Sequence, residues 1–307
     1  MIRSVPLTHL AILFFVGVVA ASAQQGSPQP PPPHHADVRY GPHERNVLDL
    51  WLAQASTPAP LVIYYHGGGF SAGDKRSIHA ELANKLLDSG IHVAAANYRL
   101  SGTDPYPAQM LDSARALQFL RLNAKRYNID PERIGAFGGS AGSGISQWLA
   151  FHEDLADPDN PDPVLRESTR LKAVGPFNAQ SSYDPRFIQK LMNTTQAHEA
   201  LAQLFRMESP ADANNPRFFS AFEDASPINH LTKDDPPILM FFSQRNDPLP
   251  PDSTGREHIH HPKFGFVLKE KADSLGVEMT LLLREDYPQG FPVDRYLAFF
   301  REKLAKR

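Results

Sequence analysis

Two glycine-rich turns, each directly after a β-prone run, constrain the fold of this chain more than any other feature. Residues 138–142 read Gly-Gly-Ser-Ala-Gly after the run 133–137, and residues 66–70 read His-Gly-Gly-Gly-Phe after the run 61–65. A G-x-S-x-G sequence between a strand and a helix turns sharply and raises the serine hydroxyl above the sheet, because its glycines carry no side chains to collide with neighbouring elements. Both turns therefore lie where strands of an α/β fold end.

Strand and helix signals alternate along the rest of the chain. A looser alternation at 46–52 indicates an outer strand, and continuous apolar runs indicate buried parallel strands at 61–65, 91–96, 133–137, 171–177, 237–242 and 277–283. Helices are expected at 78–87, 107–124, 141–152, 262–275 and 293–304. This order predicts one α/β domain, with a mostly parallel sheet covered by helices on both faces.

A long insertion separates the strands expected at 171–177 and 237–242. It exceeds what a simple crossover needs, so we expect a small lid over about 178–236. Within it, 187–205 is expected to be helical and 212–220 to be a loop. Its aromatic residues could face a substrate, but their spacing favours packing; they are Phe218, Phe219 and Phe222.

The N-terminal sequence predicts export. Arg3 precedes an apolar stretch at 10–20, and Ala-Ser-Ala at 21–23 has the small-x-small pattern of a signal-peptidase site. We therefore expect a signal peptide over 1–23, cleaved after Ala23, and a secreted or periplasmic mature protein. No later run reaches the roughly 20 apolar residues of a membrane span, so no stable membrane anchor is expected after cleavage.

Composition narrows the partners. A Pro-rich stretch at 24–36 favours extended structure and is expected to be a linker, which leaves 37–307 as the α/β domain. The chain has no cysteine and a formal net charge of -3 with interspersed signs, so we expect neither a disulfide nor a nucleic-acid partner. His34 and His35 are expected to be solvated, and no metal or cofactor is expected for catalysis.

The second glycine-rich turn gives the first a chemical meaning. The flexible backbone at Gly68 and Gly69 can point N–H groups at an oxyanion, together with the N–H of Ala141. The two motifs resemble those of the α/β-hydrolase superfamily, in particular the esterase and lipase branch with an HGGG loop, which includes hormone-sensitive-lipase-like and feruloyl-esterase-like enzymes. The resemblance extends over the mature domain, through the segments 97–100, 128–134 and 225–227.

The resemblance implies a serine hydrolase with Ser140 as nucleophile and Asp247 as the acid that orients a histidine. The family's histidine follows the last strand in a phrase such as His-Gly-Phe, but this chain has Gln289 before Gly290 and Phe291, and no histidine after His261. A carboxamide cannot accept the serine proton near neutral pH. If the rest of the site is intact, Gln289→His is expected to raise turnover.

A relocated base would rescue the site. His258, His260 and His261 follow Asp247 on a loop expected at the same sheet edge as Ser140, whereas His66 and His230 are weaker candidates because His66 is expected to brace the oxyanion loop. With such a base, the expected function is hydrolysis of carboxylic esters, with small-molecule or glycan esters, such as carbohydrate acetyl or hydroxycinnamoyl esters, suggested by family analogy. Without one, the chain is a degenerate hydrolase that binds a ligand or partner. An exopeptidase of the prolyl-oligopeptidase type fits less well because of the HGGG loop.

Overall fold

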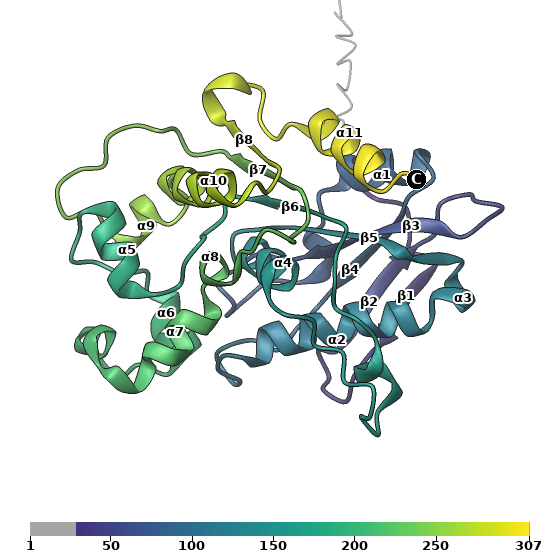
Figure 1. The fold of residues 1–307 in the computed structure, drawn as a ribbon, viewed down its shortest axis with the longest axis horizontal. Helices are drawn as coiled ribbons and strands as arrows, with labels where there is room; N and C mark the ends of the chain where they lie inside the picture. The colour runs from purple at the N-terminus through teal and green to yellow at the C-terminus, as the bar shows by residue number, and fades with distance from the viewer. Residues whose placement is uncertain (1–28, 307) are drawn as a thin grey trace, which may run out of the picture.

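A single twisted sheet organises the molecule. The structure, a computed structural model, describes residues 29–306. Its strand order is β1-β2-β4-β3-β5-β6-β7-β8, with β1 and β2 antiparallel to their neighbours and the others parallel (Figure 1). The strands are β1 His35–Arg39, β2 Val47–Trp51, β3 Ala59–Tyr65, β4 His92–Ala96, β5 Ile129–Gly139, β6 Ala173–Phe177, β7 Ile238–Phe242 and β8 Met279–Leu283.

Helices cover both faces of the sheet, as the sequence predicted. Side chains of α1 and α11 pack on one face, and those of α2, α4 and α10 pack on the other. The main helices are α1 Ala80–Asp88, α2 Ala108–Leu122, α3 Ala124–Tyr127, α4 Ala141–Phe151, α10 Lys263–Leu275 and α11 Val293–Lys303. The insertion adds α5 Pro185–Met192, α6 Ala200–Phe205, α7 Phe219–Ala225 and α8 Pro227–His230, and α9 Gly255–His258 precedes α10.

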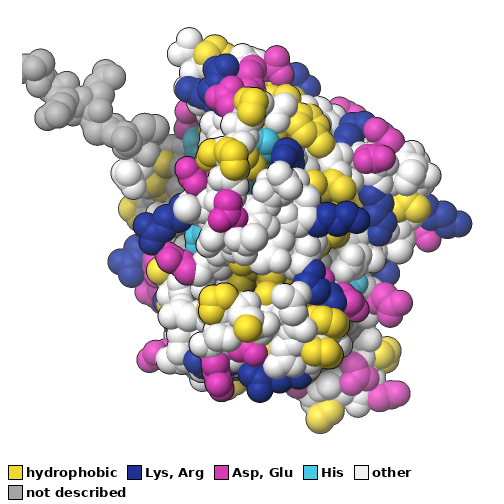
Figure 2. Space-filling view, turned by 90° about the vertical axis from the view of Figure 1, so that its left-hand side faces the viewer, with side chains coloured by type: hydrophobic (Ala, Val, Ile, Leu, Met, Phe, Trp, Pro, Cys, Tyr) yellow, Lys and Arg dark blue, Asp and Glu magenta, His cyan; other side chains and the backbone are white. Residues whose placement is uncertain are grey.

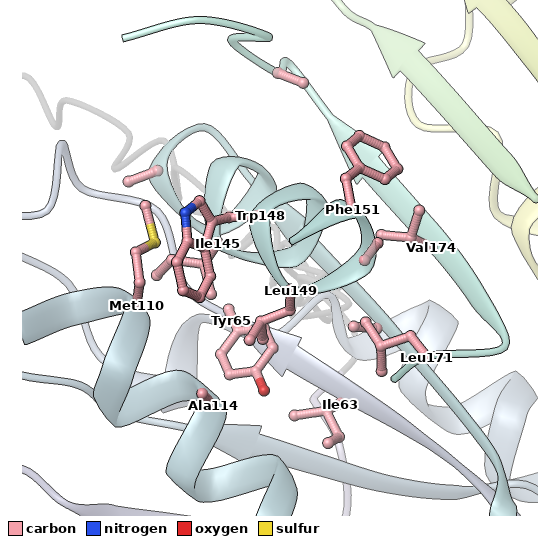
Figure 3. Packing of buried hydrophobic residues seen from close by; sticks show 14 of the residues in the cluster. Ile63, Tyr65, Met110, Ala114, Ile145, Trp148, Leu149, Phe151, Leu171 and Val174 are labelled. Atoms are coloured by element: carbon pink, nitrogen blue, oxygen red, sulfur yellow. The ribbon is translucent and has the colours of Figure 1, made fainter. Parts of the chain in front are cut away.

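The core explains why the strand runs are continuously apolar. Side chains alternate between the two faces of a strand. Ile63 and Tyr65 of β3 therefore lie on the same side of the sheet as α4, where Leu149 is next to Tyr65 (Figure 3), whereas Val62 packs on the side of α1 and α11. Every residue of α4 is buried, so the helix that follows the serine turn is held on all sides.

Three local expectations need correction. β5 begins at Ile129, earlier than the run 133–137, and the unpredicted β1 adds an edge strand. The helix expected over 187–205 is broken, because Asn193 adopts a left-handed conformation that ends α5. The loop expected at 212–220 contains two short 3-10 helices, η3 Pro210–Asn214 and η4 Pro216–Phe218, and the start of α7.

The Pro-rich segment is attached to the sheet where the structure describes it. The indole Nε1 of Trp51 donates to the carbonyl of Pro31 at 2.6 Å, and the N–H of Leu52 donates to Nδ1 of His34 at 3.1 Å. β1 begins at His35, inside the stretch expected to be linker. The signal peptide expected over 1–23 and residues 24–28 lie outside the described residues. Among residues 29–306, no helix combines the length and apolar character needed to cross a bilayer.

The insertion packs its aromatic side chains internally. The helices α5, α6 and α7 lie together at the left of Figure 1. Phe222 is buried and contacts the rings of Phe205 and Phe218, while the guanidinium of Arg186 lies 3.6 Å from the ring centre of Phe219. These contacts agree with the packing role expected for the three phenylalanines. On the face in Figure 2, positive and negative side chains are interspersed.

Candidate active site

Ser140 occupies a strained turn between β5 and α4. Its backbone has φ 52° and ψ −119°, an unusual conformation for a residue other than glycine. The glycines around it are required by space: a Cβ at Gly142 would lie 1.9 Å from the carbonyl oxygen of Tyr65, and one at Gly138 would lie 2.4 Å from that of Gly142. The turn therefore has the geometry of a nucleophile elbow.

His260 lies beside this serine. Its Nε2 is 2.9 Å from Oγ of Ser140, within hydrogen-bond distance. The histidine sits between α9 and α10, on a turn whose start is fixed by a capping box in which Thr254 and Glu257 exchange hydrogen bonds. Of the three histidines considered as relocated bases, His260 alone forms a hydrogen bond to Ser140 among the described residues.

The surroundings keep His260 neutral. Burial, together with the nearby His198, lowers the pKa of His260 from its usual 6.5 to about 4. No carboxylate among residues 29–306 is hydrogen-bonded to its ring. The pair therefore consists of a hydroxyl and a neutral imidazole, without the anionic third member that usually orients the base.

Asp247 does not supply that third member. Its side chain is 66% exposed and lies 3.2 Å from Nε of Arg245. Its backbone carbonyl, rather than its carboxylate, accepts a hydrogen bond from Nε2 of His261 at 3.0 Å. The structure thus places Asp247 in the loop before α9, with α9 between it and His260, and turns its carboxylate toward solvent.

The remaining candidate histidines have other contacts. His258 is buried, with Nδ1 3.3 Å from Oγ of Ser253, and its Nε2 has no hydrogen-bond partner among the described residues. His66 is buried under the oxyanion loop, stacked on Tyr98 and bonded through Nδ1 to the carbonyl of Gly67. Burial lowers the pKa of His66 to about 4. The expectation that His66 braces this loop fits these contacts.

Gln289 lies in the loop before α11 and is exposed. The neighbouring Phe291 anchors this loop, because its ring packs against those of Phe177 and Tyr296. Within the described residues, Gln289 forms no hydrogen bond to Ser140. The imidazole that contacts Ser140 therefore belongs to His260, and the loop after β8 does not supply it.

The oxyanion loop lies against the elbow. A Cβ at Gly67 would be 2.9 Å from the carbonyl oxygen of Gly139 and 3.5 Å from Cβ of Ser140. Gly68 and Gly69 have φ of 109° and 58°, values that glycine adopts without strain. Ala141 is the first residue of α4, so its N–H has no partner four residues earlier in the helix. These three N–H groups are the expected oxyanion donors.

A small, mostly apolar cavity opens on Ser140. Its walls come from the oxyanion loop, the insertion and the turn carrying the base, and include Phe70, Tyr183, Ile188, Leu201, His258 and Phe264. The insertion therefore shapes the site as a lid would. The sequence did not identify the apolar wall residues, because helix-like apolar spacing in an insertion does not distinguish packing from cavity lining.

Asp252 fastens the base-carrying loop to the insertion. Its carboxylate accepts hydrogen bonds from the backbone N–H and the hydroxyl of Thr195, both at 2.7 Å. These bonds, led by the backbone one, lower the pKa of Asp252 to about 2. Sequence reasoning missed this residue, although an acidic residue in a loop beside candidate histidines is a visible signal.

Known proteins with similar sequences carry esterase names. The probable carboxylic ester hydrolase LipM of Mycobacterium tuberculosis is 31% identical over 233 residues, covering 74% of this chain and 51% of LipM. Esterase LipQ of the same organism is 29% identical over 228 residues, covering 72% of this chain and 51% of LipQ. The chain thus spans about half the length of the curated relatives it matches.

Solved structures share the fold. A truncated carbohydrate esterase from gut microbiota has a TM-score of 0.69 at 23% identity, over 89% of this chain and 96% of that one. An acetyl ester-xyloside bifunctional hydrolase from Caldicellulosiruptor lactoaceticus has a TM-score of 0.63 at 23% identity, over 83% and 86%. The expected α/β-hydrolase fold is confirmed. Residues 48–256, more than half of the chain, match the family described as BD-FAE, and the protein therefore belongs to this family of α/β hydrolases.

Proposed function

We propose that this protein hydrolyses carboxylic esters through an acyl-enzyme on Ser140, with His260 as general base. The observation that carries the proposal is the 2.9 Å contact between Nε2 of His260 and Oγ of Ser140. A base must lie within hydrogen-bond reach of the proton that it removes, and His260 does so in its neutral form. The esterase names of the relatives LipM and LipQ support the same chemistry.

The reaction proceeds in two halves. Nε2 of His260 takes the hydroxyl proton as Oγ of Ser140 bonds to the ester carbonyl carbon, and the N–H groups of Gly68, Gly69 and Ala141 stabilise the resulting oxyanion. The imidazolium then gives its proton to the departing alcohol oxygen, which leaves an acyl-serine. Water then attacks the acyl carbon while His260 takes a proton from it. The bond to Oγ breaks, the imidazolium returns the proton to Oγ of Ser140, and the carboxylic acid is released.

The lack of an anionic partner for His260 sets the expected rate. In a complete triad, the acid holds the imidazole in one tautomer and stabilises imidazolium, and its loss costs about 10⁴ in turnover in a well-studied serine protease. His260 also has a low pKa, which makes it a weaker base than a histidine near 6.5. We therefore expect a slow esterase, with rates above those of an enzyme that lacks a base altogether.

The cavity indicates the class of ester. Its apolar walls favour an uncharged acyl group, and its side toward the oxyanion loop is narrow, because a Cβ at Gly69 would come within 3.2 Å of Cβ of Ala200. Short acyl esters such as acetate fit this space. The carbohydrate esterase and the acetyl ester-xyloside hydrolase named above suggest a sugar as the alcohol. Substrates of this kind suit the exported location that the N-terminal sequence predicts.

A serine-directed phosphonate tests the proposal directly. If His260 activates the hydroxyl, a fluorophosphonate probe labels Ser140 in the folded protein, and labelling slows at least tenfold in His260→Gln. Mass spectrometry of the labelled peptide identifies the serine. Labelling that is absent, or equally fast in His260→Gln, would instead favour the second candidate function, a degenerate hydrolase that binds ligands without turnover. The exposed carboxylate of Asp247 is the observation that favours this candidate.

A further inference from the structure

Three polar side chains converge at the end of α4 opposite the serine. His152 follows the last residue of α4, Asp224 lies in α7, and His230 ends α8. Nε2 of His152 is 3.6 Å from Oδ1 of Asp224, and Nε2 of His230 is 3.8 Å from the same oxygen. The ligand atoms of all three residues lie within 4.8 Å of one another, and all three residues are half-buried.

The spacing suits a metal ion. Zinc binds histidine nitrogen and carboxylate oxygen at about 2.0–2.2 Å, so tetrahedral ligand atoms are separated by roughly 3.4 Å. Both measured separations are within a few tenths of an ångström of that value. Small side-chain adjustments would therefore bring the two imidazoles and the carboxylate onto one ion.

Surrounding groups fix the orientation of His152. Its Nδ1 lies 3.0 Å from the carbonyl oxygen of Glu153, which can only accept, so Nδ1 carries the proton and Nε2 presents a lone pair to the cluster. The indole of Trp148 packs against the imidazole, with ring centres 4.1 Å apart. A backbone carbonyl on the second nitrogen is the usual arrangement around a metal-binding histidine.

Asp224 is held with one oxygen free for a ligand. The hydroxyl of Tyr106 donates to Oδ2, which leaves Oδ1 facing the two imidazoles. The indole Nε1 of Trp148 donates to the backbone carbonyl of Asp224 at 2.9 Å, which fixes the main chain at this residue. The carboxylate is thus oriented by contacts that a bound metal would not disturb.

Binding a metal ion through Nε2 would require His230 to adopt its other tautomer. Its Nε2 lies 2.7 Å from the carbonyl oxygen of Asp224, so without a metal it donates there. Metal binding replaces this hydrogen bond and moves the proton to Nδ1. The ammonium group of Lys271, which donates to the carbonyl of Ile228, opposes a cation in this region, and the charge of Asp224 offsets it.

We propose that His152, Asp224 and His230 form a zinc site that ties α7 and α8 of the insertion to α4. Two imidazoles and one carboxylate, with a fourth position left for water, are a donor set that zinc prefers, whereas calcium and magnesium prefer oxygen ligands throughout. Ser140 and His152 flank opposite ends of α4, about 18 Å apart for a separation of 12 residues, so the ion would stabilise the insertion and take no part in ester chemistry.

Calorimetric titration with zinc chloride tests the site. The purified, chelator-treated protein is expected to bind one zinc ion, and His230→Gln and His152→Gln are each expected to weaken binding at least tenfold. Zinc should raise the thermal unfolding midpoint of the wild type and have little effect on these variants. Cobalt bound in place of zinc should give the visible absorption of a tetrahedral nitrogen and oxygen site, and His230→Gln should remove it.

Two control variants keep the test decisive. Combined His34→Gln and His35→Gln removes another histidine pair and should leave zinc binding unchanged. Asp224→Asn keeps the shape of the carboxylate and provides a third ligand variant if His152→Gln fails to fold. The proposal is overturned if the wild type binds no zinc, or if zinc binds the folded ligand variants as tightly as the wild type.

Discussion

Nε2 of His260 lies 2.9 Å from Oγ of Ser140, although His260 precedes α10 and does not follow the last strand. The loop after β8, where the resemblance led us to expect a histidine, has the exposed Gln289. A serine and an imidazole thus meet through a different loop of the same sheet edge. The loop that carries His260 is held in turn by the insertion, so the lid region contributes to the position of the base.

The kcat/KM of the enzyme should begin to fall only at low pH. Burial and the neighbouring His198 lower the pKa of His260 to about 4 from its usual 6.5, so the base is expected to stay neutral down to about pH 4. We expect kcat/KM for an uncharged ester to remain nearly constant from pH 7 to pH 5, where an ordinary histidine would lose most of its activity. Stopped assays across this range measure it.

Stability supplies the control for that profile. Because His66 and His260 are buried with lowered pKa values, the unfolded chain binds more protons than the folded one between about pH 4 and 6.5, and stability should decline as the pH falls through this range. Samples held at each pH and assayed at pH 7 separate unfolding from titration of the base. If activity falls with a midpoint near pH 6.5, in samples that recover full activity when assayed at pH 7, the lowered pKa of His260 is contradicted.

Loosening the base-carrying loop should slow turnover. Asp252 joins this loop to Thr195 of the insertion through two hydrogen bonds of 2.7 Å, so Asp252→Ala is expected to lower kcat about tenfold or more, since misplacement by 1 Å costs up to about 10²-fold. Asp252→Asn retains one acceptor oxygen and should restore part of the rate. An unchanged kcat in Asp252→Ala would show that the loop holds its position without the insertion.

Gln289→His separates the two possible origins of the base. Gln289 is exposed, and His260 already occupies the hydrogen-bonding position on Ser140, so we now expect less than about a twofold gain in turnover. Asp247, exposed beside Arg245, would not orient the new imidazole. The matched measurement is the same substitution in a His260→Gln background. A rise of tenfold or more in either background would mean that the loop after β8 still reaches the serine.

A buried ion pair should join β2 to the segment that follows the oxyanion loop. Nζ of Lys75 lies 2.7 Å from Oδ2 of Asp49, and both side chains are almost fully buried. Asp49→Ala removes the buried partner of the Lys75 ammonium group and should lower the free energy of unfolding in urea by about 3 kcal/mol. This is the lower end of the usual range, because Asp37 still lies beside Lys75. Asp294→Ala, which removes the exposed partner of Lys85, is the control, with an expected cost well below that of Asp49→Ala. Equal costs would contradict this assignment.

Local sequence was enough to predict the serine turn, the oxyanion loop and most of the sheet. At Gly142 the backbone of Tyr65 leaves no room for a side chain. The turn therefore requires glycine there, and the glycine in the sequence indicates the turn. Buried strands such as β3 are apolar on both faces, which makes their runs visible. The break at Asn193 and the edge strand β1 escaped prediction, because tertiary contacts decide whether such polar residues continue or end an element.

Local sequence could not show which histidine contacts Ser140. Three histidines within four residues looked equivalent in sequence, and their difference arises only when α9 and its capping box direct His260 toward Ser140 and turn His258 inward. The orientation of Asp247 depends on the same loop, whose course is set by long-range bonds to the insertion. Spacing along the chain contains neither piece of information.

The most direct test is the hydrolysis of p-nitrophenyl acetate by the wild type, Ser140→Ala, His260→Gln and His261→Gln, prepared identically. We predict measurable turnover in the wild type, background rates in Ser140→Ala, a loss of at least about 10²-fold in His260→Gln, and at least tenfold more activity in His261→Gln than in His260→Gln. Wild-type rates equal to those of Ser140→Ala, or full activity in His260→Gln, would contradict the Ser140–His260 pair as the catalytic centre.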